Sequence, residues 1–276
     1  MAKPEGEAAK YVLGHSDREL ERLRLQAKLV DPITRQFLIE AGIGPGMRVL
    51  DIGCGAGDVA FLAGALVGTT GQVVGVDRAA AALEKARARA KEKSLSNVTF
   101  RESDLAAMEF DESFDAVIGR YVMCFQPDPV ALLGKIAGLL RPGGIVAFHE
   151  PDRDLMRSYP PAPTYDLACR WLSETYRRSG VDVSIGTKLY SMFQDAGLPA
   201  PTMRLHAIVG GASALDEIHL DADQATIVAA DIVRLGVATA DELQIETLFD
   251  RIVAEMAANR SVIVGRGEIG VWSRRM

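Results

Sequence analysis

Short apolar segments alternate with helical patterns through the middle of the chain. Five segments are predicted to be buried strands of a parallel sheet, because each contains a short run of mainly apolar residues that ends in glycine or polar residues. They lie within residues 47–53, 72–77, 97–104, 114–125 and 144–150. Segments with helical spacing and helix-favouring composition stand between them at 58–67, 79–94 and 127–140. This alternation with short connections predicts an α/β fold with a doubly wound sheet and right-handed crossovers.

The segments on either side of this alternation are predicted to be mainly helical. Apolar residues recur at helical spacing from Ser16 to Ala41. Asp31-Pro32 is expected to divide this region into two helices, because proline disfavours the helical conformation in the residue before it. Beyond residue 151, we expect a helix that carries Tyr165, Trp171 and Tyr176, helices at 187–198 and over most of 214–260, and strands at 202–211 and 267–276.

Composition and charge narrow the functional classes. The 276 residues are 48% hydrophobic and 25% charged, the balance of an ordinary globular protein. The net charge of −6 argues against a nucleic-acid-binding protein, whose surface would be basic. The three cysteines have no CxxC spacing, which favours a reducing compartment over a disulfide framework or a zinc site. Because no signal peptide or membrane-spanning run is visible, we expect a cytoplasmic protein with no membrane span and no metal.

A glycine-rich turn follows the first predicted strand. The strand ends at Asp51, and Gly53, Gly55 and Gly57 come directly after it. Ligands of parallel α/β sheets bind at the carboxyl ends of the strands, and glycines let the backbone turn sharply and approach the ligand. The helix that follows offers its N-terminal amides to an anionic group. Since residues 55–60 also fit the dinucleotide pattern GxGxxA, the turn alone leaves a nicotinamide or flavin cofactor open.

Polar residues at the ends of the next two strands complete a nucleoside site. Asp77 stands twenty positions after Gly57, where a carboxylate can accept both ribose hydroxyls; its alternative role is to cap the following helix. Asp104 is expected to accept the exocyclic amine of adenine, and the Leu105 amide to bind a ring nitrogen; otherwise Asp104 is an ordinary loop carboxylate. Arg78 is expected beside the adenosine, with a solvated helix start as the alternative.

Two further residues stand at the ends of the fourth and fifth strands. Arg120 is expected to bind the part of the ligand that lies beyond the adenosine, next to the substrate. His149 is a candidate general base, because an imidazole titrates near neutral pH. Its alternative is a histidine that is simply hydrogen-bonded at a strand end.

Taken together, these motifs resemble those of the class I S-adenosylmethionine-dependent methyltransferases. The matching segments are Asp51–Gly57, Val73–Asp77, Ser103–Leu105, Phe114–Asp128 and Leu139–Glu150 with its LRPGG turn. The resemblance covers roughly residues 45–151 and is greatest to the ubiquinone/menaquinone-biosynthesis type and related small-molecule methyltransferases. It implies S-adenosylmethionine as the cofactor. It also implies a seven-stranded, mostly parallel sheet whose last strand, at VWSRR, is antiparallel.

The lead-in to this core is similar to that of some small-molecule methyltransferases in which the N-terminal segment folds over the cofactor. The similarity implies that Tyr11 and Gln26 lie near the methionine moiety. The expected organisation is a helical lid at 1–44, a cofactor-binding core at 45–151, helical cap insertions at 152–183 and 212–262, and the rest of the core sheet at 184–211 and 263–276.

The resulting functional prediction is methyl transfer to a small organic molecule. The helical insertions suggest an enclosed pocket for such an acceptor. The fourth strand ends in GRYVMCFQPDP and lacks the Asn/Asp-Pro-Pro-Tyr/Phe signature of nucleic-acid amino methylation. O-, N- and C-methylation stay open, as does a homodimer. The competing functions are a nicotinamide- or flavin-dependent oxidoreductase and a non-catalytic S-adenosylmethionine-binding protein.

Overall fold

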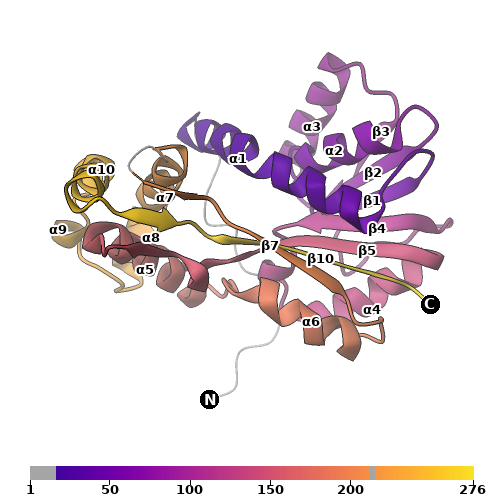
Figure 1. Ribbon diagram of the computed structural model, residues 1–276. Helices are drawn as coiled ribbons and strands as arrows, with labels where there is room; N and C mark the ends of the chain where they lie inside the picture. The colour runs from indigo at the N-terminus through magenta and orange to yellow at the C-terminus, as the bar shows by residue number, and fades with distance from the viewer. Residues whose placement is uncertain (1–16, 212–214) are drawn as a thin grey trace. The chain divides into compact units, whose positions relative to one another are not determined.

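A computed structural model describes residues 17–211 and 215–276 of the chain (Figure 1). It divides the chain into two compact units, each assembled from separate stretches of sequence. The core unit consists of Asp31–Glu150, Gly186–Leu205 and Ile269–Met276. The accessory unit consists of Met1–Val30, Pro151–Ile185 and His206–Glu268.

A seven-stranded sheet forms the centre of the core unit, with the strand order β3-β2-β1-β4-β5-β10-β7. Its strands are β1 (Arg48–Ile52), β2 (Gln72–Asp77), β3 (Val98–Glu102), β4 (Phe114–Arg120), β5 (Leu140–Asp152), β7 (Thr202–His206) and β10 (Gly267–Arg274). The pairs that link β3, β2, β1, β4 and β5 are parallel. The Gly143 amide donates to the Arg275 carbonyl (2.9 Å) and the Arg275 amide to the Gly144 carbonyl (2.8 Å), as expected for an antiparallel β10. The predicted α/β fold with a mostly parallel sheet is therefore confirmed.

Helices cover both faces of this sheet. Those of the core unit are α2 (Asp58–Val67), α3 (Ala80–Glu92), α4 (Pro129–Leu139), α6 (Ile185–Asp195) and the second half of α1 (Asp17–Ala41). Helices α2 and α3 lie on one face, and α4 and α6 lie on the other (Figure 1). Helix α2 buries Val59, Ala60, Ala63 and Val67 against the strands, in a core that includes Val49 and Ile118. Because α2 begins directly after Gly57, this packing holds the glycine turn at the carboxyl end of β1.

Helix α1 corrects one prediction. The chain is helical from Asp17 to Ala41, with Pro32 inside the helix, so the expected break at Asp31-Pro32 is wrong. A proline removes one backbone hydrogen bond and strains the preceding turn, but packing of the next turns can offset that cost. Here Thr34, Phe37 and Leu38 are at most 4% exposed. The boundary between the two units nevertheless falls between Val30 and Asp31, next to the proline.

The accessory unit is a helical bundle with a small sheet that the sequence patterns do not predict. Its helices are α5 (Pro163–Arg178), α7 (Leu215–Ile227), α8 (Ala229–Arg234), α9 (Ala240–Leu243) and α10 (Leu248–Asn259). Strands β6 (Arg157–Tyr159), β9 (Val262–Val264) and β8 (Val209–Gly210) form an antiparallel sheet in that order. Each strand is too short to show a periodic pattern, which explains why only helices were expected in the insertions.

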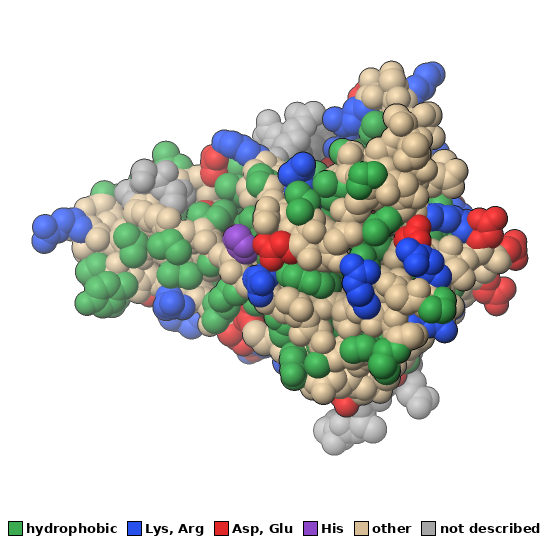
Figure 2. All heavy atoms as spheres, turned by 45° about the vertical axis from the view of Figure 1, so that its right-hand side comes forward, with side chains coloured by type: hydrophobic (Ala, Val, Ile, Leu, Met, Phe, Trp, Pro, Cys, Tyr) green, Lys and Arg blue, Asp and Glu red, His purple; other side chains and the backbone are tan. Residues whose placement is uncertain are grey.

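Two features of the surface and the helices bear on the expected partners. On the face drawn in Figure 2, Lys and Arg side chains are interspersed with Asp and Glu side chains. Within residues 17–211 and 215–276, no helix has both the length and the apolar character needed to span a bilayer.

Candidate functional site

The glycine turn lies between β1 and α2, at the carboxyl edge of the sheet. Gly53, Gly55 and Gly57 have φ angles of +62°, +51° and +90°, in the left-handed region that favours glycine. A Cβ atom at Gly57 would come within 2.9 Å of the Phe100 ring. A Cβ atom at Gly55 would meet nothing within 4 Å. The backbone at Gly55 therefore borders open space, whereas Gly57 is packed against the protein.

Asp77 fastens the glycine turn to the end of β2. One carboxylate oxygen of Asp77 accepts the Gly55 amide (2.9 Å), and the other accepts the Ala79 amide (2.8 Å). The N-cap residue of α3 is Ala79, so Asp77 precedes the helix and binds the cap residue itself. Each carboxylate oxygen has a second lone pair, so these bonds leave acceptor capacity for ribose hydroxyls.

Asp51 is a buried carboxyl group beneath the turn. It is 1% exposed, and neither of its oxygens has a hydrogen-bond partner in the described part of the chain. Burial raises the pKa of this carboxyl well above its ordinary value, while the Arg120 charge and the nearby Ala60 backbone amide lower it. A buried polar group without a partner is costly unless a ligand supplies one. S-adenosylmethionine carries an ammonium and a sulfonium cation, so an acidic group beside an open glycine turn fits this cofactor.

The predicted adenine-contacting residues lie at the same strand edge. The Ser103 amide donates to the Asp77 carbonyl (3.0 Å), so the ends of β2 and β3 are adjacent. Asp104 is exposed in the following turn and accepts the Ala106 amide (2.7 Å). Leu105 is half-buried there, and Arg78 is exposed between β2 and α3. Their nucleoside contacts remain predictions, but the structure brings Asp77 and the Asp104 turn together.

Arg120 is held by side chains that sequence analysis did not select. Its guanidinium lies 2.7 Å from an Asp31 oxygen, 3.0 Å from the Thr34 hydroxyl and 3.9 Å from an Asp58 oxygen. The Arg120 side chain is 7% exposed. Asp31 precedes it by 89 residues, a separation that no local pattern reveals. Of the three partners of Arg120, only Asp58 could have been predicted, because it follows the glycine turn directly as the first residue of α2.

His149 lies in the same network as Arg120. Its Nδ1 atom is 2.9 Å from the Thr34 hydroxyl, which also accepts from Arg120. The Phe37 and Tyr121 rings pack edge-on against the imidazole, with centroids 4.9 and 5.5 Å away. His149 is 2% exposed. The structure thus places His149 in a fixed position at the strand edge, and its role as a base remains a prediction.

Glu150 has a structural role that sequence analysis missed. One of its oxygens accepts the amides of Val122 (2.8 Å) and Met123 (2.9 Å), and the other accepts the Cys124 amide (3.3 Å). Burial raises the pKa of Glu150 to about 7, while these hydrogen bonds lower it. The carboxyl group thereby ties β5 to the short helix η1 (Met123–Phe125).

The remaining predicted residues belong to the start of the chain. Tyr11 lies outside the described residues. Gln26 is half-buried in α1, on the part of the helix that belongs to the accessory unit. In the described ranges, no group of three or more His, Cys, Asp or Glu residues is arranged to hold a metal ion.

Comparison with known families identifies the class of the domain. Residues 43–197, more than half of the chain, match the family model described as Methyltransferase domain. The chain therefore belongs to this family, as a class I S-adenosylmethionine-dependent methyltransferase domain. The predicted class and cofactor are confirmed.

Curated relatives agree with this class. The chain is 39% identical over 129 residues to aklanonic acid methyltransferase DauC of Streptomyces sp., covering 46% of this chain and 59% of that protein. It is 38% identical over 120 residues to 2-phytyl-1,4-naphtoquinone methyltransferase of Synechococcus elongatus (42% and 52%). It is 36% identical over 124 residues to demethylmenaquinone methyltransferase of Lactococcus lactis (45% and 47%). The chain thus spans about half the length of the curated relatives it matches.

Solved structures share the fold. The YcgJ protein of Bacillus subtilis matches with a TM-score of 0.56 at 21% identity, over 88% of this chain and 99% of that one. The [4+2]-cyclase SpnF matches with a TM-score of 0.55 at 18% identity, over 89% and 80%. Since one of these proteins is described as a cyclase, the fold by itself does not specify the reaction.

Proposed function

We propose that the protein transfers a methyl group from S-adenosylmethionine to a small organic acceptor. The observation that carries the proposal is Asp51, a buried carboxyl group that lacks a partner and lies beneath a glycine turn open at Gly55. A cationic cofactor satisfies this group, whereas the anionic pyrophosphate of a nicotinamide or flavin dinucleotide would add negative charge beside it. The match to the methyltransferase family supports the same choice.

In this proposal the chain's own residues bind and orient the cofactor. Asp77 binds the ribose, the turn at Asp104 and Leu105 binds adenine, and Arg78 lies at the adenosine edge. The turn at Gly53 and Gly55, together with Arg120, surrounds the methionine end, and Tyr11 and Gln26 are assigned to it by the sequence resemblance alone. The bound cofactor supplies an activated methyl group on a sulfonium leaving group. The protein therefore has mainly to align the acceptor and exclude water.

The acceptor is proposed to be a small molecule because the three curated relatives are named for such substrates, an aromatic acid and two quinones. The chemical nature of the acceptor determines whether an oxygen, a nitrogen or a carbon atom receives the methyl group. His149 is the proposed general base for an acceptor that must lose a proton.

Binding of S-adenosylhomocysteine tests the cofactor assignment. Calorimetry should show micromolar binding that Asp77→Ala weakens by about tenfold, equivalent to about 1.4 kcal/mol. Glu84→Ala, which removes an exposed carboxylate from α3, should leave affinity unchanged and serves as the control. Absence of binding to the unaltered protein would falsify the proposal.

Turnover on hydroxyquinone and aromatic acid acceptors tests the reaction. Formation of S-adenosylhomocysteine that depends on the acceptor is expected, and cofactor binding without turnover on any of them would support a non-catalytic protein instead. With an acceptor in hand, His149→Ala should lower kcat with little effect on cofactor affinity. An unchanged kcat would remove His149 as the base.

A further inference from the structure

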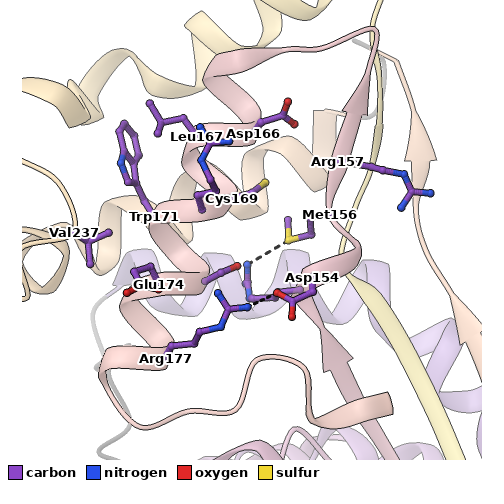
Figure 3. A pocket seen from close by; sticks show the side chains of 13 residues that line it. Asp154, Met156, Arg157, Asp166, Leu167, Cys169, Trp171, Glu174, Arg177 and Val237 are labelled. Atoms are coloured by element: carbon purple, nitrogen blue, oxygen red, sulfur yellow. Dashed lines mark hydrogen bonds and ion pairs between the residues drawn. The ribbon is translucent and has the colours of Figure 1, made fainter. Parts of the chain in front are cut away.

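The accessory unit contains a cavity of about 580 Å³ along one side of α5 (Figure 3). Helix α5 forms one wall, and the segment from Arg153 to Arg157 contributes to the other. An ion pair between Arg177 of α5 and Asp154 joins the two walls (Figure 3). The volume lies within the range of pockets that hold small organic ligands.

The residues that line the cavity carry more positive than negative charge. They include four arginines and three carboxylates. All three carboxylates already have partners: Asp154 pairs with Arg177, Asp166 accepts the Ser158 hydroxyl (2.9 Å), and Glu174 pairs with Arg178 outside the lining (2.7 Å). Arg157 donates to the Leu155 carbonyl (3.0 Å), and neither Arg157 nor Arg170 forms an ion pair within the described ranges. The cavity therefore has positive charge to offer in a protein whose net charge is −6.

A buried arginine adds to this charge. Arg153 lines the cavity and is 7% exposed. Its guanidinium donates to the neutral Gln224 side chain and to the Met156 sulfur (3.7 Å), stacks on the Tyr176 ring (5.2 Å) and forms a long ion pair with Asp221 (3.9 Å). Asp221 also interacts electrostatically with Arg266, so it does not serve Arg153 alone, and a planar guanidinium is suited to bind a carboxylate group.

Apolar side chains line the same space. Met156, Leu167, Trp171 and Val237 belong to the lining, and Trp171 is 6% exposed. An inorganic anion would leave these side chains without contacts, whereas an organic acid would place its hydrocarbon body against them.

From these observations we propose that the cavity binds a small organic acid, with its carboxylate toward Arg153 and Arg170 and its apolar or aromatic body against the apolar side chains of the lining. The site belongs to the accessory unit alone and does not depend on the proposed methyl transfer. It can accordingly be tested without S-adenosylmethionine.

Calorimetry with the full chain tests the proposal, using 2-naphthoate as probe and 2-naphthamide as its neutral isostere. We expect one naphthoate per chain and at least tenfold weaker binding of the amide. The variant Arg170→Gln should weaken naphthoate binding about fivefold without changing the affinity for the amide. The matched control is Arg260→Gln, which removes an exposed charge of the same unit outside the lining and should change neither affinity.

Four results would overturn the proposal. They are no naphthoate binding at millimolar concentration, equal affinity for acid and amide, an equal loss in Arg260→Gln, and displacement of naphthoate by inorganic phosphate at equal affinity. The last would show that the apolar wall contributes nothing. An unchanged melting temperature in Arg170→Gln confirms that the variant is folded, and Arg170→Ala replaces it if it is not.

Discussion

At the scale of single residues, Asp51 is a buried acidic group that costs stability. Neither of its oxygens has a hydrogen-bond partner of ordinary geometry among the described residues, although the nearby Ala60 backbone amide lowers its pKa. Arg120 lowers its pKa, but Asp31, Thr34 and Asp58 also engage that guanidinium. Burial prevails, so the pKa of Asp51 is raised. An acid with a raised folded-state pKa is most favourable to folding below its unfolded pKa and loses that contribution as the pH rises toward its folded pKa.

Replacement of Asp51 by Asn should therefore separate stability from binding. At pH 7 the ligand-free variant should be more stable by about 1 kcal/mol, because the buried group can no longer ionise. The affinity for S-adenosylhomocysteine should fall about tenfold, because the ammonium group loses its counter-charge. Thermal unfolding with and without the ligand measures both effects. A ligand-free variant that melts lower and binds as well as the unaltered protein would contradict this account.

At the scale of elements, the glycine turn contains two positions with different constraints. Gly55 and Gly57 both have positive φ, but only a Cβ atom at Gly57 would collide with neighbouring rings. The same substitution at the two sites therefore separates backbone strain from packing.

Gly57→Ala should cost more stability than Gly55→Ala. Left-handed backbone strain costs about 1–2 kcal/mol at either site, and the contacts with Phe100 and Phe61 add about 1–3 kcal/mol at Gly57. Gly55→Ala should stay folded and lose S-adenosylhomocysteine affinity, since its methyl group enters the open space. Chemical denaturation and calorimetry on the two variants provide the comparison. Equal stability losses would show that the Phe100 and Phe61 rings move aside.

Helix α1 also has a consequence that can be measured. Pro32 is exposed inside a continuous helix, so Pro32→Ala should restore a backbone hydrogen bond and raise stability by roughly 1–3 kcal/mol. Arg35→Ala, at an exposed site one turn later, is the matched control and should change stability by less than about 0.5 kcal/mol. Lower stability in Pro32→Ala would contradict this expectation.

Local sequence patterns correctly predicted those helices and strands that are recognisable from their own residues, without knowledge of long-range contacts. The expected bounds of α2 and β2 agree with the structure. Both elements can be recognised in a short window of sequence, since α2 follows a run of glycines and β2 is rich in valine. Strands β6 and β9 were missed because each has three residues and pairs across the accessory unit, whereas β8 lies within the strand expected at 202–211. The Asp31–Arg120 pair was missed for a related reason. Its partners meet only after β4 and α1 have packed.

At the scale of the whole molecule, each unit contains a buried glutamate with a pKa near neutrality. Burial raises the pKa of Glu150 in the core unit to about 7. Burial and the neighbouring Asp221 raise the pKa of Glu217 in the accessory unit to about 7, while Arg266 lowers it. The usual value for both groups is 4.5. Both units thus favour the protonated form of one carboxyl group more strongly than the unfolded chain does.

Stability should consequently decline as the pH rises from 5 to 8. Each group contributes fully below pH 4.5 and has lost its contribution above pH 7, about 3 kcal/mol for a shift of this size. Denaturation at several pH values measures the slope, and Glu217→Gln should reduce it. Glu246→Gln is the exposed control and should leave it unchanged. Stability that rises over this interval would contradict the burial argument.

The position of β10 affects how the protein can fold during synthesis. This strand, Gly267–Arg274, lies between β5 and β7 in the interior of the sheet. A ribosome releases it only after the other six strands of this sheet have emerged, so β5 and β7 wait with unpaired edges while much of the accessory unit is translated. Unpaired edges are prone to pair with other chains. The nascent protein is therefore expected to be a substrate for chaperones until its last strand inserts.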